Sequence, residues 1–235
     1  MRVSLVAYTP NPDQVCDMAA RTCTSSECPE LLTAVNKTRA LEHALASGHE
    51  SVAEHATFTF QVEGVSRVTE IQLVRHRLAS YSIQSGRYCD RKASEFIIPE
   101  SISKAIESEL MNGGGWSPNG CLESDLNELK KDLDAIDARM QKLGIPAEDR
   151  RYLYPQGIMT NITFSMNARE LRHFFYERCC THAQWEIKEM AEKMLELVRE
   201  VAPVLFDDAG SKCKRLGYCP EAKGCSLMKP KEAKE

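Results

Sequence analysis

Two segments of this chain alternate hydrophobic and polar residues, the pattern of a β-strand with one buried face. In residues 57–63 the apolar side chains of Phe58, Phe60 and Val62 would point to the same side. Residues 158–166 repeat the pattern, and residues 2–7 are a further strand candidate. The sequence therefore predicts a sheet built from these strands.

Other segments repeat apolar residues every three or four positions, which predicts amphipathic helices. Asn167, followed three residues later by Glu170, matches a capping box and predicts the start of one helix. The long stripe at 122–143 steps by four and three, so it predicts an internal packing face or, as the alternative, a subunit contact. The predicted helices cover residues 30–47, 65–78, 122–143, 168–175 and 187–201.

These elements predict one α/β domain of the α+β type, with a central mixed or antiparallel sheet flanked by long helices. The glycine-rich residues 112–120 predict a loop, and no internal repeat or long linker divides the chain. The Cys-, Lys- and Gly-rich tail after Phe206 is expected to pack loosely, so we expect a domain at 1–206 and a tail at 207–235. The chain has no Gly-x-Gly-x-x-Gly after a strand and no phosphate-binding loop, which argues against a Rossmann oxidoreductase.

Composition narrows the class of protein. The 235 residues, 43% of them hydrophobic, are enough for one substantial core, and the net charge of -4 argues against a dedicated nucleic-acid binder. No apolar run approaches the roughly 18 residues that cross a bilayer, and the amino terminus does not resemble a signal peptide. We expect a cytoplasmic protein with no membrane or nucleic-acid partner, whose ten cysteines are mostly reduced.

Cations gather locally against this acidic background. Arg75, His76 and Arg77 are followed by Ser85 and Arg87 within one short stretch. Guanidinium groups bind phosphate and carboxylate through paired hydrogen bonds, so the stretch predicts an anionic ligand. The alternative is a helix C-terminus that attracts cations through its dipole.

The spacing Arg-His-Arg-x7-Ser resembles the signature of the flavin-dependent thymidylate synthases, which methylate dUMP without a cysteine nucleophile. Four further segments resemble the family in the same order, and the matches run from about Ala20 to Glu186. The chain has Ser82-Ile83-Gln84 where the family commonly has Asn-Glu before the serine, and His173 where Asn is usual. The four segments are His49 to His55, Glu148 to Arg151, Asn167 to His173, and Arg178 to Glu186.

The resemblance implies a role for each matching residue. Arg178 would stabilise negative charge on the uracil ring. Ser85 would donate a hydrogen bond to the substrate, because a serine without an adjacent base is unreactive. His49 would line the folate region. The residues expected to bind dUMP are Gln72, Gln84, Ser85, Gly86, Arg87, Arg151 and Arg178. Those expected to bind FAD are Ser51, Glu54, Arg75, His76, Arg77, Asn167, Arg169, His173 and His182.

The resemblance also implies the reaction partners. Methylenetetrahydrofolate would supply the carbon, NAD(P)H would reduce the flavin, and the sites would lie between subunits of a homotetramer. A metal is not expected at His49 and His55, because their spacing places them on different sides of a helix. The regular spacing of Cys213, Cys219 and Cys225 is compatible with zinc, but free thiols are the preferred interpretation.

Some residues have a structural interpretation beside the functional one. Ser51 could cap a helix, Arg151 could lie in a solvated turn before Pro155, and Trp185 is expected to anchor the core. Two other functions also fit the cationic stretch. One is an RNA-binding module that uses Arg75, Arg77 and nearby tyrosines. The other is a flavoprotein reductase with a different acceptor.

Overall fold

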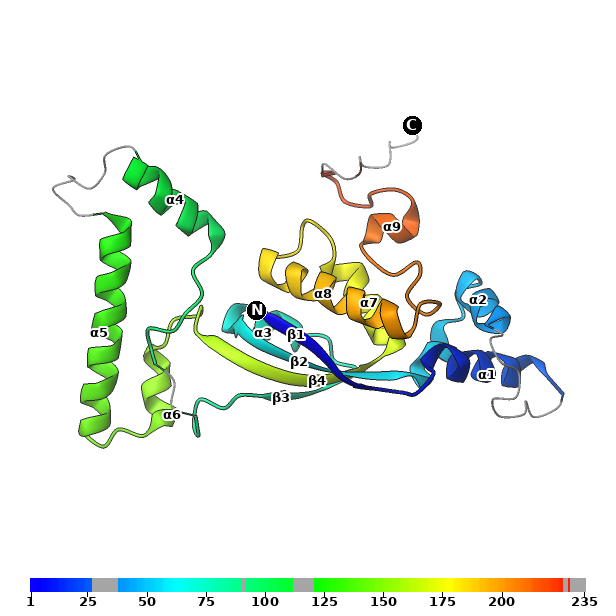
Figure 1. Ribbon diagram of the computed structural model, residues 1–235, viewed down its shortest axis with the longest axis horizontal. Helices are drawn as coiled ribbons and strands as arrows, with labels where there is room; N and C mark the ends of the chain where they lie inside the picture. The colour runs from blue at the N-terminus through cyan, green and yellow to red at the C-terminus, as the bar shows by residue number, and fades with distance from the viewer. Residues whose placement is uncertain (27–37, 90–91, 112–120, 226–227, 229–235) are drawn as a thin grey trace. The chain divides into compact units, whose positions relative to one another are not determined.

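The computed structural model describes residues 1–26, 38–89, 92–111, 121–225 and 228. Figure 1 shows the helices and strands of the chain, which divides into two compact units. Unit 1 comprises Met1–Glu63, Gln72–Ser82 and Ile162–Glu235, and unit 2 comprises Gly64–Ile71 and Ile83–Asn161. The elements in chain order are β1 Arg2–Tyr8, α1 Pro12–Thr24, α2 Arg39–Ala46, η1 Glu50–His55, β2 Thr57–Ser66, α3 Arg67–Leu73, β3 Ala79–Ile83, α4 Glu100–Met111, α5 Leu122–Lys142, α6 Ala147–Arg150, η3 Arg151–Leu153, β4 Met159–Asn167, α7 Ala168–Arg178, α8 Trp185–Val201 and α9 Lys212–Leu216.

The strands form one four-stranded antiparallel sheet in the order β1-β2-β4-β3, which confirms the predicted fold class. β1 pairs with β2 from Arg2 opposite Glu63 to Tyr8 opposite Phe58, with an irregularity between Leu5 and Ala7. All three predicted strands are present. Phe58, Phe60 and Val62 are fully buried, as the alternation predicted.

The structure of the region that follows β2 differs from the sequence prediction. The predicted helix at 65–78 is only α3, Arg67–Leu73, and the unpredicted strand β3 follows it at Ala79–Ile83. Val65 is buried as part of β2, whereas Leu78 is 69% exposed. The apolar residues that suggested one helix therefore belong to the end of β2, to the short helix α3 and to the turn that follows it. Arg75, His76 and Arg77 lie between α3 and β3, so they do not occupy the last turns of a helix.

Helices α7 and α8 complete the core of unit 1 and confirm two predicted helices. The Asn167 side chain caps α7 by accepting a hydrogen bond from the Glu170 backbone N–H at 2.9 Å. Aromatic rings join the layers, because Phe58 and Phe175 both pack edge-on against Phe206. The residues of α8 that are buried in this core are Glu186, Ile187, Met190, Ala191, Met194, Leu195 and Val198.

Helix α1 was not predicted from the sequence, because it carries few apolar residues in a regular stripe. Buried carboxylates fix it instead. Asp13 accepts hydrogen bonds from the backbone N–H groups of Val204 and Leu205, and burial raises the pKa of this carboxyl. Asp17 accepts from Ala40 and Leu41 at the start of α2. Helix α2 confirms the later part of the predicted helix at 30–47, while residues 30–37 lie outside the described residues.

In unit 2, α5 confirms the long predicted helix, but its apolar stripe does not form a buried face. No residue of α5 is buried, and Leu129 and Ile136 are 47% and 46% exposed. The expected internal packing face is therefore wrong within this chain, and polar contacts hold α5 to its neighbours. Asp134 on α5 accepts from Ser94 Oγ at 2.7 Å. The predicted loop at 112–120 lies outside the described residues.

The carboxyl-terminal segment packs more closely than expected. Phe206 and Ala209 are fully buried, and α9 is anchored to the body of unit 1 by an ion pair between Arg215 and Glu50 at 2.6 Å. Arg172, fully buried in α7, donates to Asp208 at 2.6 Å and to the Leu205 carbonyl. The expectation of loose packing from Phe206 onward is therefore wrong for this part of the tail. The tail packs closely because charged residues before and after Phe206 pair with one another, as Arg172 does with Asp208.

We expect replacement of Arg172 by Met to lower the free energy of unfolding by about 2–3 kcal/mol, because it removes the buried donor to the Leu205 carbonyl and to the Asp208 carboxylate. Urea unfolding followed by circular dichroism measures this change. The matched control is Lys188→Met, which removes an exposed ion pair with Glu192 on α8 and should change stability by less than about 0.5 kcal/mol. Equal effects of the two substitutions would contradict the anchoring role of Arg172.

Candidate active site

The predicted cationic stretch begins in a turn that Tyr81 holds in place. The Tyr81 hydroxyl donates to the carbonyl of Leu73, the last residue of α3, at 2.8 Å. It also contacts the His76 carbonyl oxygen at 2.7 Å. Burial raises the pKa of Tyr81, so its hydroxyl keeps its proton at neutral pH. The turn between α3 and β3 is therefore tied to its own following strand.

His76 lies at the centre of a buried group in unit 1. Its Nδ1 lies 3.2 Å from Glu170 Oε1, and its Nε2 lies 3.1 Å from Arg178 Nε. The Phe174 ring packs edge-on against the imidazole with 4.9 Å between ring centroids. Glu170, His173, Phe174 and Arg178 all come from α7, at spacings that place them near one another on the helix surface.

The protonation of this group follows from its partners. Burial, followed by the charges of Arg178 and His173, lowers the pKa of His76 to about 4, so the imidazole is neutral at pH 7. Arginine can only donate, so Nε2 must be the nitrogen that accepts and Nδ1 carries the proton toward Glu170. Burial also raises the pKa of Glu170. The structure thus brings together the predicted residues His76, His173 and Arg178, and adds Glu170.

Two other predicted flavin residues form a pair of their own. Arg169, at the start of α7, makes an ion pair with Glu54 of η1, and this partner raises the pKa of the guanidinium. Asn167 is used as the cap of α7. The side chains of Arg75 and Arg77 are exposed and have no ion-pair partner among the described residues. These two cations remain available to an anionic ligand.

The segment predicted to line the folate and flavin region is the 3-10 helix η1. His49 is the N-cap residue of η1, and Ser51 and Glu54 are exposed within it. The alternative interpretation of Ser51 as a helix cap is therefore wrong.

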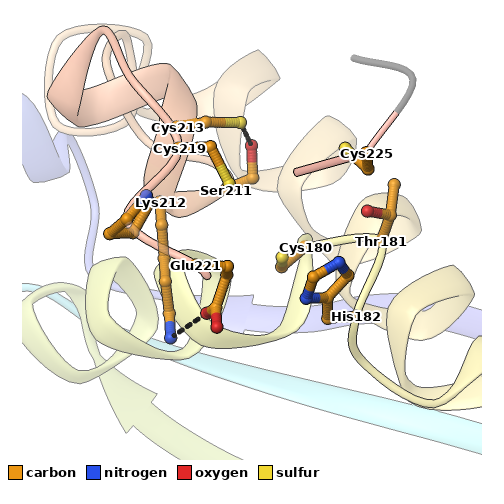
Figure 2. Close-up of a pocket in the computed structure, with 10 residues that line it drawn as sticks. Cys180, Thr181, His182, Ser211, Lys212, Cys213, Cys219, Glu221 and Cys225 are labelled. Atoms are coloured by element: carbon orange, nitrogen blue, oxygen red, sulfur yellow. Dashed lines mark hydrogen bonds and ion pairs between the residues drawn. The ribbon is translucent and has the colours of Figure 1, made fainter. Parts of the chain in front are cut away.

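His182 is not part of the group around His76. It lines a separate small cavity of about 10 Å³ with Cys180, Cys213, Cys219 and Cys225 (Figure 2). The nine described cysteines are free thiols. Within the described part of the chain, no three His, Cys, Asp or Glu side chains are placed to hold a metal ion. The neighbours of His182 in unit 1 therefore do not support its predicted role in binding a flavin.

In unit 2, the predicted Ser85-Gly86-Arg87 segment forms a tight turn. Ser85 Oγ accepts from the Arg87 backbone N–H at 3.1 Å, and Arg87 pairs with Glu148 at 2.9 Å. Gly86 lies so close to Arg151 that a Cβ there would be 3.2 Å from Arg151 Cδ. Gly86 thus lets the two segments approach, and the structure brings together Ser85, Gly86, Arg87 and Arg151.

This turn borders a hollow of about 380 Å³, a size typical of small-molecule sites. Arg67 and Arg151 supply its positive charge, and Tyr152 and Tyr154 supply aromatic surface. Arg67 was not predicted as a site residue from the sequence; it is the first residue of α3 and pairs with Glu70 at 2.8 Å. The sequence signal that could have identified Arg67 was its position directly after the alternating strand.

The remaining predicted residues have less distinctive surroundings. Gln84 is held by its backbone N–H, which donates to the Asn161 carbonyl at 2.9 Å. Gln72 is half-buried near the end of α3.

Trp185 is 44% exposed, so the expectation that it anchors the core is wrong, and Ile187 takes that place. Arg150, rather than Arg151, is the buried arginine before Pro155, and it lies 3.6 Å from Asp137.

The described helices include none that is long and apolar enough to span a bilayer.

Comparison with known proteins places the chain in a family. A family model described as "Thymidylate synthase complementing protein" matches residues 4–204. A flavin-dependent thymidylate synthase of Geobacter sulfurreducens is 42% identical over 240 residues, covering 100% of this chain and 97% of the relative. Proteins of the same name from Pyrococcus horikoshii (41% identical, 98% of this chain, 93% of the relative) and Nitratidesulfovibrio vulgaris (40%, 94% and 91%) are also similar. The match confirms the resemblance seen in the motifs, and the chain is an enzyme that belongs to the flavin-dependent thymidylate synthase family.

Proposed function

We propose that this enzyme converts dUMP into dTMP, with 5,10-methylenetetrahydrofolate as the carbon donor and FAD, reduced by NAD(P)H, as the source of hydride. The names of its relatives support thymidylate synthesis with a flavin. The observation that carries the proposal is the position of Arg178. Its guanidinium is held by a buried neutral imidazole through Nε, and no partner of its Nη1 and Nη2 is recorded among the described residues. Those nitrogens can meet negative charge that develops on a pyrimidine.

The residues of unit 2 fit the nucleotide. Arg151 and Arg67 line a hollow large enough for a small molecule, and Arg87 lies on the turn that borders it. Guanidinium groups suit a phosphate because they offer paired donors. Arg87 would have to exchange its partner Glu148 for the phosphate, and both side chains are about half exposed, so the exchange costs little. Gln84 and Gly86 would complete the binding of dUMP in this unit, and Gln72, which belongs to unit 1, is a further expected contact of dUMP.

Ser85 fits a binding role better than a nucleophilic one. Its Oγ accepts from the Arg87 backbone N–H, and no base is recorded beside it among the described residues. A serine needs an adjacent base to attack. The hydroxyl hydrogen is therefore free to be donated to the substrate, while its oxygen keeps the turn closed.

The residues of unit 1 fit an anionic flavin cofactor. Exposed Arg75 and Arg77 can bind its diphosphate, and Arg169, Asn167 and Ser51 offer further donors. FAD supplies hydride chemistry that no side chain provides. The neutral His76 would present no positive charge to a flavin, so its task is to orient Arg178. Glu54, His173 and His182 would line the same cofactor, and His49 the folate.

We further propose that the active enzyme is a cytoplasmic homotetramer in which residues from different subunits complete each site. Size-exclusion chromatography with light scattering tests the assembly, for which a chain of 26.4 kDa predicts about four times that mass.

We expect titration with FAD to quench flavin fluorescence and to yield a yellow protein. Arg75→Ala combined with Arg77→Ala should weaken FAD binding by about tenfold or more, because two cations near a diphosphate are lost. Arg139→Ala, an exposed arginine of α5, is the control and should leave the affinity unchanged. If neither FAD nor FMN binds the wild-type protein, the flavin assignment is wrong.

Arg178→Ala should lower the rate of dTMP formation by about a hundredfold or more, since an interaction with developing charge is worth several kcal/mol. NAD(P)H should still reduce the flavin, because that step does not involve uracil. Stopped-flow absorbance at the flavin band and chromatographic detection of dTMP measure the two steps separately. Equal loss of both would show that Arg178 acts in folding or cofactor binding.

Ser85→Ala should weaken dUMP binding by about tenfold, because a neutral hydrogen bond contributes about 1 kcal/mol and one to a charged partner somewhat more. Turnover should remain measurable at saturating dUMP. A Ser85→Ala enzyme that binds dUMP normally and has no activity would instead identify Ser85 as a nucleophile.

A further inference from the structure

We propose that Glu170 is a positioning residue, which orients Arg178 by fixing the tautomer of His76. This inference rests on the proposed function for its consequence in turnover. The geometry of the three side chains stands independently of it.

The three side chains form a continuous line within unit 1. Glu170 Oε1 lies 3.2 Å from His76 Nδ1, and His76 Nε2 lies 3.1 Å from Arg178 Nε. Glu170 and His76 are each only 6% exposed, so water does not compete for these contacts. Each hydrogen bond is therefore stronger than a comparable one at the surface.

Only one arrangement of protons satisfies the whole line. Arg178 Nε carries a hydrogen at every accessible pH, so His76 Nε2 must present its lone pair. His76 Nδ1 must then carry the proton and needs an acceptor, which Glu170 provides. Without that acceptor, the imidazole can place its proton on Nε2. An N–H on Nε2 would face the N–H of Arg178, and the guanidinium would turn away.

The surroundings of the imidazole keep it in this line. Phe174 packs edge-on against the ring, and the Tyr81 hydroxyl binds the carbonyl of His76 itself. The charged and titratable groups that face His76 are Glu170, His173 and Arg178 from α7 and Tyr81 from β3. Burial, together with the nearby Arg178 and His173, holds the pKa of His76 at about 4. The ring therefore remains a neutral acceptor above about pH 5.

The side chain of Glu170 takes no part in capping α7, whose start is fixed by Asn167. The Glu170 backbone N–H is bound by the Asn167 cap, while its side chain leaves the helix toward His76. In a capping box this side chain would return to the N-cap backbone. The sequence pattern therefore locates the helix start, but the carboxylate makes a contact with a residue far away in the sequence.

The test compares Glu170→Gln with Glu170→Leu. Glutamine keeps an acceptor oxygen for His76 Nδ1–H, whereas leucine keeps the approximate volume without one. We expect Glu170→Leu to weaken dUMP binding and to lower dTMP formation by about ten- to a hundredfold, the range found when the hydrogen-bond partner that orients a metal-binding histidine is lost. Glu170→Gln should stay within about threefold of the wild type. Glu189→Leu, which removes a half-exposed carboxylate of α8, is the matched control and should have no effect.

A second comparison shows whether Glu170 acts through Arg178. In an Arg178→Lys background, Glu170→Leu should add little to the loss of dUMP affinity, because the guanidinium it positions is already absent. A further loss as large as in the wild type would overturn the proposal. So would equal damage by Glu170→Gln and Glu170→Leu in the wild-type background.

A spectroscopic readout separates this inference from the proposed reaction. In protein labelled with ¹⁵N-arginine, the Arg178 Nε–H resonance is identified by its absence in Arg178→Lys. It should exchange slowly with water in the wild type and in Glu170→Gln, and rapidly in Glu170→Leu. If the wild type makes no dTMP from dUMP but shows this pattern, the proposed function fails and the positioning of Arg178 stands. Rapid exchange in the wild type overturns the positioning.

Discussion

The candidate active site of unit 1 depends on one buried, neutral imidazole held between a carboxylate and a guanidinium. Burial alone would make each of these groups costly, because a polar group removed from water must find a partner. His76 satisfies Glu170 on one side and Arg178 on the other. The same contacts occupy Nε of Arg178 and leave Nη1 and Nη2 for a ligand. One arrangement of protons therefore determines both how the group packs and which atoms can act on a substrate.

Helix α7 is the element that makes this arrangement possible. It begins at a cap provided by the last residue of β4, and its inward residues recur at the spacing of helical turns. On another side of the same helix, Arg172 is fully buried and binds Asp208 and the Leu205 carbonyl. The helix is thus fixed at its start by a cap and along its length by buried polar contacts. A rigid support of this kind suits a site in which an arginine side chain must be held in one orientation.

The sequence predicted β2, β4, α7 and α8 because each of these elements buries one face. It failed where polar contacts replaced apolar periodicity. Helix α1 is held by Asp13 and Asp17, whose buried carboxylates accept backbone N–H groups far away in the chain. The apolar stripe of α5 suggested a packing face, yet no residue of α5 is buried. Periodicity shows that a face is apolar, but it does not identify what covers that face.

The amino-acid sequence by itself determined the family, because the order and spacing of its motifs are local properties of the chain. It also determined which residue types could bind anions, including Arg75, Arg87 and Arg178. Only the tertiary structure decided how these residues are used. It placed His182 among cysteines, freed Arg75 from ion pairs among the described residues, and joined Glu170 to His76. Such pairings bring together residues distant in sequence, so no local pattern specifies them, and the packing of the whole unit selects them.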